Sequence, residues 1–154
     1  MIIAINQDQY NKDNILFSEK TKNNILNNGN FYRIFYSPSS FSMNGIHLYF
    51  DLQNIHLESY FNKIKCTFDK IRNKSVIDNI KQLEKDILAV SPNEMKTPTY
   101  RIEEQLSQGF IKIFSEDEYR KFNNQNVQIL LKISGVWTDT TNYGITFRFF
   151  FNHP

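Results

Sequence analysis

The chain lacks the cysteine pairs of disulfide-stabilised proteins and the long apolar runs of membrane-spanning proteins. It has one cysteine, Cys66, among 154 residues, so no disulfide can form within it. The apolar run at its start is too short for a signal peptide, and no stretch approaches membrane-spanning length. We therefore expect an intracellular protein with no membrane partner.

Catalytic and metal-binding motifs are also missing from the sequence. It holds no P-loop, no glycine-rich dinucleotide fingerprint, no zinc-protease helix and no nucleophile elbow. Its three histidines, His47, His56 and His153, lack the spacing of a metal site. The adjacent carboxylates at 103–104 and 116–118 lie in polar runs that are typical of solvated surfaces. We expect a protein that is not an enzyme, with no catalytic residue, no metal site and no cofactor.

The overall composition is that of a folded protein. Hydrophobic residues make up 40% of the chain and charged residues 22%, a balance typical of globular rather than disordered proteins. The length favours one domain, which we place at residues 30–154. It follows a polar segment, residues 1–29, in which Ile2, Ile3 and Ile5 are candidates for a short strand. The net charge of +2 is too small to identify a polyanionic partner by itself.

Apolar and polar residues alternate along much of the chain, a pattern typical of half-buried β-strands. The alternation runs through residues 31–37, 42–52, 60–69 and 110–114. It is strongest in residues 127–151, where two alternating runs flank the turn Asn142-Tyr143-Gly144. This arrangement predicts a C-terminal β-hairpin.

Each strand of this hairpin is expected to have an apolar face and a mixed face. In the first strand the apolar face holds Ile129, Leu131, Ile133 and Trp137, and the other holds Lys132, Ser134 and Thr138. In the second strand the two faces hold Ile145, Phe147, Phe149 and Phe151, and Thr146, Arg148 and Phe150. Gly135 inside the first strand predicts a β-bulge or a sharp bend. Trp137 is interpreted as either a core residue or a stacking platform, and Tyr143 at the turn is expected to be exposed.

One amphipathic helix is predicted at about residues 75–90. Ser75 is placed to cap its start, and Ser91-Pro92 ends it. Residues 99–106 are ambiguous, and residues 115–122 are expected to form one or two helical turns. The order of elements predicts a mainly β fold. A small β-barrel of five to six antiparallel strands with one helix fits this order better than an open α+β sheet or a jelly-roll sandwich.

The side chains expected to point outward from the strands combine cations with aromatic rings. One strand presents Phe61, Lys63 and Lys65, a second presents Phe110, Lys112 and Phe114, and the hairpin presents Lys132 and Arg148. Single-stranded nucleic acid requires this chemistry, because cations contact phosphates and rings stack on bases. With Trp137 and Tyr143, these residues form the candidate nucleic-acid-binding site. Lys and Phe also have A/T-rich codons, so the alternative is that these residues are ordinary surface and packing residues of a compositionally biased chain.

The hairpin sequence LLKISGVWTDTTNYGITFRF resembles the last strands of OB-fold single-stranded DNA-binding proteins from large DNA viruses and related elements. LSQGFIKIF, upstream, is similar to the preceding strand of such proteins. The resemblance implies an OB-like barrel with Lys132, Trp137, Tyr143 and Arg148 in or beside the binding hairpin. It also implies a location in the cytoplasm, a host nucleus or a viral factory. Many replicative members end in an acidic tail that recruits partners, whereas this chain ends in residues 149–154, which are apolar and neutral to basic, so recruitment by a tail is not expected.

Residues and resemblance together predict a largely sequence-independent single-stranded DNA-binding protein that coats strands in replication or recombination. RNA stays an alternative ligand, because no pattern in this chain separates RNA from DNA. A homo-oligomer is compatible with the sequence. The competing function is a non-enzymatic structural or assembly protein, in which exposed aromatic rings form an interface with another subunit or partner.

Overall fold

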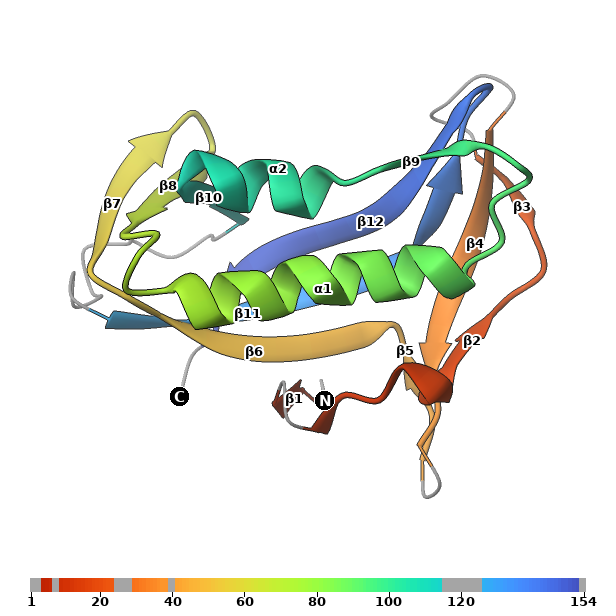
Figure 1. Cartoon of the computed structure of the whole chain (residues 1–154), viewed down its shortest axis with the longest axis horizontal. Coiled ribbons are helices and arrows are strands. Elements are labelled where there is room, and N and C mark those ends of the chain that lie inside the picture. Colours follow the sequence, from red (N-terminus) through yellow and green to blue (C-terminus); the bar gives the residue numbers. More distant parts are fainter. Residues whose placement is uncertain (1–3, 7–8, 24–28, 39–40, 115–125, 153–154) are drawn as a thin grey trace.

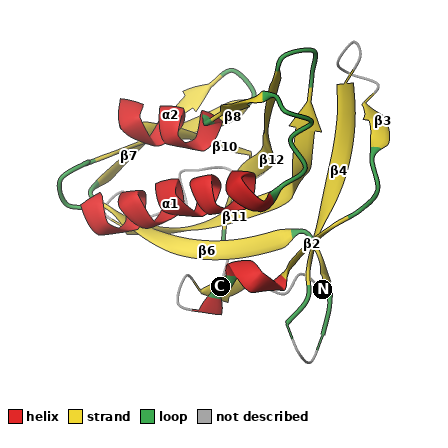
Figure 2. Cartoon of the chain, turned by 45° about the vertical axis from the view of Figure 1, so that its right-hand side comes forward, coloured by secondary structure: helices red, strands yellow, loops and turns green. Residues whose placement is uncertain are grey.

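The structure of the protein is a computed structural model that describes residues 4–6, 9–23, 29–38, 41–114 and 126–152. The described residues form a mixed sheet of twelve strands with two α-helices on one of its faces (Figures 1 and 2). The main strand order of this sheet is β1-β6-β11-β12-β10-β8-β7. β4 continues the edge of β11 beyond β6 and pairs with β2, β3 and β5.

Eight described strands and a short 3-10 turn, η2 (Lys12–Asn14), precede the first helix. The strands are β1 (Ile5–Asn6), β2 (Ile15–Phe17), β3 (Thr21–Asn23), β4 (Gly29–Tyr36), β5 (Met43–Asn44), β6 (Ile46–Gln53), β7 (Ile55–Tyr60) and β8 (Lys63–Phe68). β1 pairs with β6, and both β2 and β3 pair with β4. The described part of the N-terminal segment is therefore built into the same sheet.

The second half of the chain contains both helices and the strands that frame them. Its elements are α1 (Lys74–Val90), β9 (Thr97–Thr99), α2 (Arg101–Gln108), β10 (Phe110–Phe114), β11 (Asn126–Thr138) and β12 (Asn142–Phe151). The helix predicted at about 75–90 is confirmed as α1, and the ambiguous segment at 99–106 forms most of α2. The helical turns predicted at 115–122 lie outside the described residues.

The start of α1 differs from the expectation. The helix begins at Lys74, so Ser75 lies inside it and the prediction that Ser75 caps the helix is wrong. The Asn73 side chain instead accepts a hydrogen bond from the Gln53 backbone N–H (2.8 Å) and donates to the Gln53 carbonyl (2.8 Å). It thereby ties the start of α1 to the end of β6. Neither described helix is long and apolar enough to cross a membrane.

The expectation of a mainly β fold is confirmed, but the expected small barrel of five to six antiparallel strands is not what the structure shows. Twelve described strands form an open sheet, and β1 and β7 stand at opposite ends of its main order. Three pairings among the described strands are parallel: β1 with β6, β10 with β12, and β9 with β12. Alternation along a strand predicts its two faces but carries no information on which strand lies beside it, and this is why the sheet order was not foreseen.

The core lies between the helices and one face of the sheet. Cross-strand neighbours from β6 to β8 supply a continuous apolar row: Leu48, Leu131, Phe149, Ile113 and Ile64. All five are buried, and Leu48 faces Ile80 and Leu83 of α1 across a small hollow. This row marks the inner face of the sheet, and the opposite face is called the outer face below.

A β-bulge in β11 changes which face Trp137 occupies. The register between β11 and β12 shifts between Ile133 and Gly135, as the glycine predicted. A Cβ on Gly135 would overlap the Phe31 ring and the Tyr32 carbonyl oxygen, so the bulge requires glycine. Because Trp137 now pairs with Gly144 and Gly135 with Thr146, Trp137 lies on the outer face with Arg148. The prediction that Trp137 shares a face with Ile133 is wrong. Strict alternation assumes no bulge, and the one extra residue in the bulge reverses the faces of the residues that follow it.

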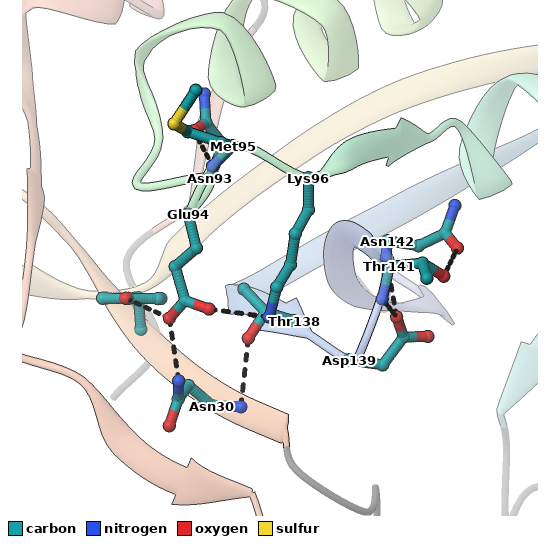
Figure 3. Close-up of polar contacts among 10 residues, drawn as sticks. Asn30, Asn93, Glu94, Met95, Lys96, Thr138, Asp139, Thr141 and Asn142 are labelled. Atoms are coloured by element: carbon teal, nitrogen blue, oxygen red, sulfur yellow. Dashed lines mark hydrogen bonds and ion pairs between the residues drawn. The ribbon is translucent and has the colours of Figure 1, made fainter.

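The loop after α1 is fixed to β4 by Glu94 (Figure 3). Its carboxylate accepts hydrogen bonds from Lys96 Nζ (2.7 Å), the Tyr32 hydroxyl (2.7 Å) and Asn30 Nδ2 (2.8 Å). These contacts hold the pKa of Glu94 at about 2. Asp139 closes the turn between β11 and β12 in a similar way, accepting from the backbone N–H groups of residues 141 and 142 (2.9 and 2.6 Å). Lys96 of the first cluster directly precedes β9, and the Thr97 N–H of β9 donates to the Thr141 carbonyl in the turn (3.0 Å).

Candidate nucleic-acid interface

The outer face of the sheet carries interleaved cations and aromatic rings, and we call this set the basic-aromatic face. Its members come from β7, β8, β10, β11 and β12: Tyr60, Lys63, Lys65, Phe110, Lys112, Phe114, Lys132, Trp137, Arg148 and Phe150. Cross-strand pairing brings Lys112 opposite Lys65 and Lys132 opposite Arg148. Like charges directly opposite each other destabilise a sheet, so this arrangement costs stability where no anion is bound.

Each cation around β8 and β10 lies over a ring. Lys63 Nζ is 4.5 Å and Arg148 Cζ 4.9 Å from the centre of the Phe114 ring. Lys65 Nζ is 4.6 Å from the Phe110 ring, and Lys112 Nζ is 5.1 Å from the Tyr60 ring. Such contacts are each worth about 0.5–1 kcal/mol at exposed sites. The rings therefore hold the cations in place on the face without neutralising their charge.

A hollow of about 350 Å³ adjoins this face at the edge of β12, and we call it the cationic hollow. Its cations are Lys63, Arg101, Lys112 and Arg148, and its rings are Phe114, Trp137, Phe147 and Phe149. None of its described lining residues is Asp or Glu. It forms because β9 and β10 both pair with the same edge of β12, β9 at residues 142–144 and β10 at 149–150, with α2 between them. The intervening edge of β12 faces the hollow instead of a strand.

Trp137 forms one wall of the cationic hollow. The Arg101 guanidinium carbon lies 4.5 Å from the centre of the Trp137 ring, and Trp137 is 5% exposed. The indole packs so closely on Gly144 that a Cβ there would lie 2.7 Å from the ring. Its Nε1 is buried and has no hydrogen-bond partner among the described residues. An unpaired buried donor is costly, which sets Trp137 apart from an ordinary core residue.

Arg101 is held in this place by the contact between the two helices. It is the first residue of α2, whose N-cap, Tyr100, makes no side-chain cap. The cap is supplied from α1: Glu84, fully buried, accepts the Ile102 and Glu103 backbone N–H groups, both at 2.9 Å. Burial raises the pKa of Glu84 against the lowering effect of these two hydrogen bonds. The start of α2 is thus fixed to α1, and Arg101 with it.

Ion pairs leave most of this positive charge uncompensated. Within the described residues, the one acidic partner on the basic-aromatic face is Glu58, whose carboxylate lies 3.7 Å from Lys65 Nζ. Both side chains of that pair are at least 30% exposed, so it contributes little stability. The four cations of the cationic hollow make no ion pair with a described residue. Arg101 also interacts with the Asp139 carboxylate at longer range, and the charge of Lys63, Lys112 and Arg148 is available to an anion from solution.

The structure brings five of the predicted site residues together in the cationic hollow: Lys63, Lys112, Phe114, Trp137 and Arg148. Lys65, Phe110 and Lys132 lie on the same face outside it. Phe61 lies at the margin of this face, in the two-residue turn between β7 and β8, where it is 91% exposed and its ring packs edge-on against Tyr60 with 5.0 Å between ring centres. Its φ of 55° is unusual for a bulky residue and marks a strained position.

The expectation that Tyr143 is exposed is wrong. It is 6% exposed, and its hydroxyl donates a hydrogen bond to the Leu88 carbonyl of α1 (3.3 Å). Burial raises the pKa of this hydroxyl. Tyr143 pairs with Thr138 on the inner face, because the hairpin turn is formed by residues 140–141 and Tyr143 already lies within β12.

Six lining residues of the cationic hollow were missed by sequence reasoning: Ile145, Thr146, Phe147 and Phe149 of β12, and Arg101 and Gln105 of α2. Arg101 and Gln105 are one helical turn apart, and Gln105 Oε1 accepts the Lys112 backbone N–H (3.3 Å). The one signal in the sequence is this i, i+4 spacing, on a segment whose helical pattern is short.

Other chemically capable side chains lie away from this site. Burial raises the pKa of Cys66 to about 12, which keeps the thiol protonated and unreactive. Burial and the nearby Lys132 lower the pKa of His47, whose Nδ1 has no partner among the described residues. The described residues contain no group of three or more His, Cys, Asp or Glu side chains placed to hold a metal ion.

Comparisons with protein-family models, curated proteins and solved structures give no match to this chain. The resemblance of the C-terminal hairpin to OB-fold single-stranded DNA-binding proteins therefore stays a prediction from its residues.

Proposed function

We propose that the protein binds single-stranded DNA with little sequence preference and coats it, using the basic-aromatic face and the cationic hollow. The observation that carries this proposal is the set of cation-over-ring contacts on one face of the sheet, with Glu58 as the one described acidic partner. Cations and rings on one surface are the two components that single strands require.

Binding follows from an exchange of partners. A cation resting on a ring gains about 0.5–1 kcal/mol, whereas a hydrogen bond between charged groups is worth about 1.5–3 kcal/mol. A phosphate can therefore draw Lys63 and Arg148 away from Phe114. The ring that they leave is then free to stack on a base. Each stacked base adds about 1–3 kcal/mol with little dependence on its identity.

The same exchange favours single strands over duplexes. Bases in a duplex are already stacked on each other, so their faces cannot reach Phe114 or Phe110 without unpairing. Phosphate contacts alone would remain, and these give weak, non-specific affinity. RNA single strands carry the same phosphates and base faces, so RNA is a competitor ligand in the test.

Fluorescence anisotropy of a labelled oligo-dT of about 30 nucleotides, long enough to cover the site several times at about 4–16 nucleotides each, tests this function. We expect tight binding at low salt that an unlabelled duplex fails to compete. Lys112→Glu should weaken it strongly, whereas Lys81→Glu, the same change on α1 at the opposite side of the sheet, should not. Absence of binding at low salt would refute the proposal.

The exposed end of the sheet at β7 favours a second function, assembly with another protein chain. β7 is the last strand in the main order, and Phe61 beside it is 91% exposed. Among the described strands β7 pairs with β8 alone, and a strand edge without a neighbour, with an exposed ring beside it, can take up another chain by strand addition. In that case the protein is a structural or assembly component, and size-exclusion chromatography would show an oligomer that neither salt nor oligonucleotide changes.

A further inference from the structure

The cationic hollow holds more positive charge than one phosphodiester group of a nucleic-acid strand would neutralise. Four cations from β8, α2, β10 and β12 line a space of about 350 Å³, with no carboxylate among the described lining residues. That volume falls in the range of about 300–1,000 Å³ typical of small-ligand pockets. A phosphodiester carries one negative charge. A terminal phosphate monoester carries about −1.5 to −2 at neutral pH and offers three strong acceptor oxygens.

The shape of the cationic hollow also fits the end of a nucleic-acid strand better than its middle. Along β12 it is bounded on one side by the pairing with β9 at residues 142–144 and on the other by the pairing with β10 at residues 149–150. A continuous nucleic-acid strand could cross the outer face beside the cationic hollow. The nucleic-acid strand could not run through the hollow along β12, because the pairings with β9 and β10 close both sides.

Two arginines give this site its geometry. Arg101 and Arg148 approach from different elements, and each guanidinium can bind two phosphate oxygens at once. Each currently rests on a ring, Arg101 on Trp137 (4.5 Å) and Arg148 on Phe114 (4.9 Å). When a phosphate takes the guanidinium groups, both ring faces are left for the base or sugar of the terminal nucleotide.

We infer that the cationic hollow binds a phosphate monoester, namely the phosphorylated end of a nucleic-acid strand. The strand-end part of this inference rests on the proposed function, while binding of the monoester itself does not. A free nucleoside monophosphate presents the same chemistry and serves as a separate probe.

The experiment compares short oligo-dT strands of about 12 nucleotides, about the length of one binding site, with a 5′-phosphate, a 3′-phosphate or no terminal phosphate. We expect one phosphorylated form to bind about tenfold more tightly than the unphosphorylated strand. Arg101→Gln and Arg148→Gln should remove this preference. Lys132→Gln, which lies on the basic-aromatic face outside the cationic hollow, should weaken all three strands alike and leave the ratio unchanged.

The outcomes separate this inference from the proposed function. Equal affinity for the three strands, with binding still salt-sensitive, would overturn the inference and leave the proposed function standing. If no strand binds at low salt, the proposed function fails. Trp137 fluorescence titrated with thymidine monophosphate, thymidine and inorganic phosphate then decides the inference. A response to the monophosphate that Arg101→Gln removes supports a monoester site, and no response to the monophosphate overturns it.

Discussion

The Arg101 guanidinium lies over the Trp137 ring, 4.5 Å from its centre, although the two residues come from a helix and a strand that are 36 positions apart. Three features produce the contact. The bulge at Gly135 turns Trp137 to the outer face, β9 and β10 leave part of the β12 edge open, and Glu84 fixes the start of α2.

Trp137 is the one tryptophan of the chain and therefore reports directly on the cationic hollow. If a phosphate draws Arg101 away, the environment of the indole changes, so binding of oligo-dT should shift the intensity or wavelength of tryptophan emission. Arg101→Gln should alter the emission of the free protein and reduce the response. Unchanged emission at oligonucleotide concentrations where anisotropy shows saturation would place the ligand elsewhere.

Replacing Phe61 with glycine should stabilise the protein and weaken its binding of oligo-dT. Glycine relieves the cost of a positive φ, so Phe61→Gly should raise the free energy of unfolding by about 1 kcal/mol in urea titrations. The same variant loses an exposed ring and should bind oligo-dT more weakly. Phe61→Ala is the matched control, because it loses the ring but keeps a Cβ at the strained position. It should show the binding loss without the gain in stability, and a similar gain in both variants would contradict the strain argument.

Removing the Glu84 carboxylate should destabilise the protein and disturb the cationic hollow. Glu84→Ala leaves two backbone N–H groups at the start of α2 without a partner, which should cost about 2 kcal/mol in chemical denaturation. Binding should fall as well, because Arg101 begins that helix. Glu104→Ala, an exposed change in the same turn of α2, should alter stability by about 0.5 kcal/mol or less. Equal losses in the two variants would show that Glu84 does not act as the cap of α2.

Glu94 should make stability sensitive to acid. Its pKa is about 2 in the folded protein and near 4.5 when unfolded, so its contribution is present at neutral pH. That contribution is lost as the pH falls from about 5 towards 2. The gap in unfolding free energy between the wild type and Glu94→Gln should therefore be widest near pH 7 and should narrow in acid. A gap that does not change with pH would mean that the carboxylate charge is not what stabilises the loop.

The sequence was most informative about strands, faces and α1. Alternation correctly predicted β10, β11, β12 and the buried row that includes Leu131 and Phe149, because these patterns depend on local spacing alone. It also identified Gly135 as a bulge. The face of Trp137 was predicted wrongly, because one extra residue reverses the parity of everything after it.

The arrangement of the site depends on contacts between segments far apart in the sequence, which local patterns do not predict. Arg101 reaches Trp137 because β9 and β10 both add to the same edge of β12, and such pairing is non-local. Tyr143 looked like the tip of a turn, but the burial of its hydroxyl against Leu88 depends on where α1 crosses the sheet. Residue types were therefore predictable, while their assembly into the cationic hollow was not.

The dependence of oligo-dT affinity on salt, measured for the wild type and for Arg148→Gln, tests the central claim most directly. If four of the five cations of the basic-aromatic face each neutralise one phosphate, the logarithm of the association constant should fall against the logarithm of salt concentration with a slope of about −3. Arg148→Gln should reduce the magnitude of that slope by about 0.7. A wild-type slope near zero, or one that Arg148→Gln leaves unchanged, would contradict the role assigned to the basic-aromatic face.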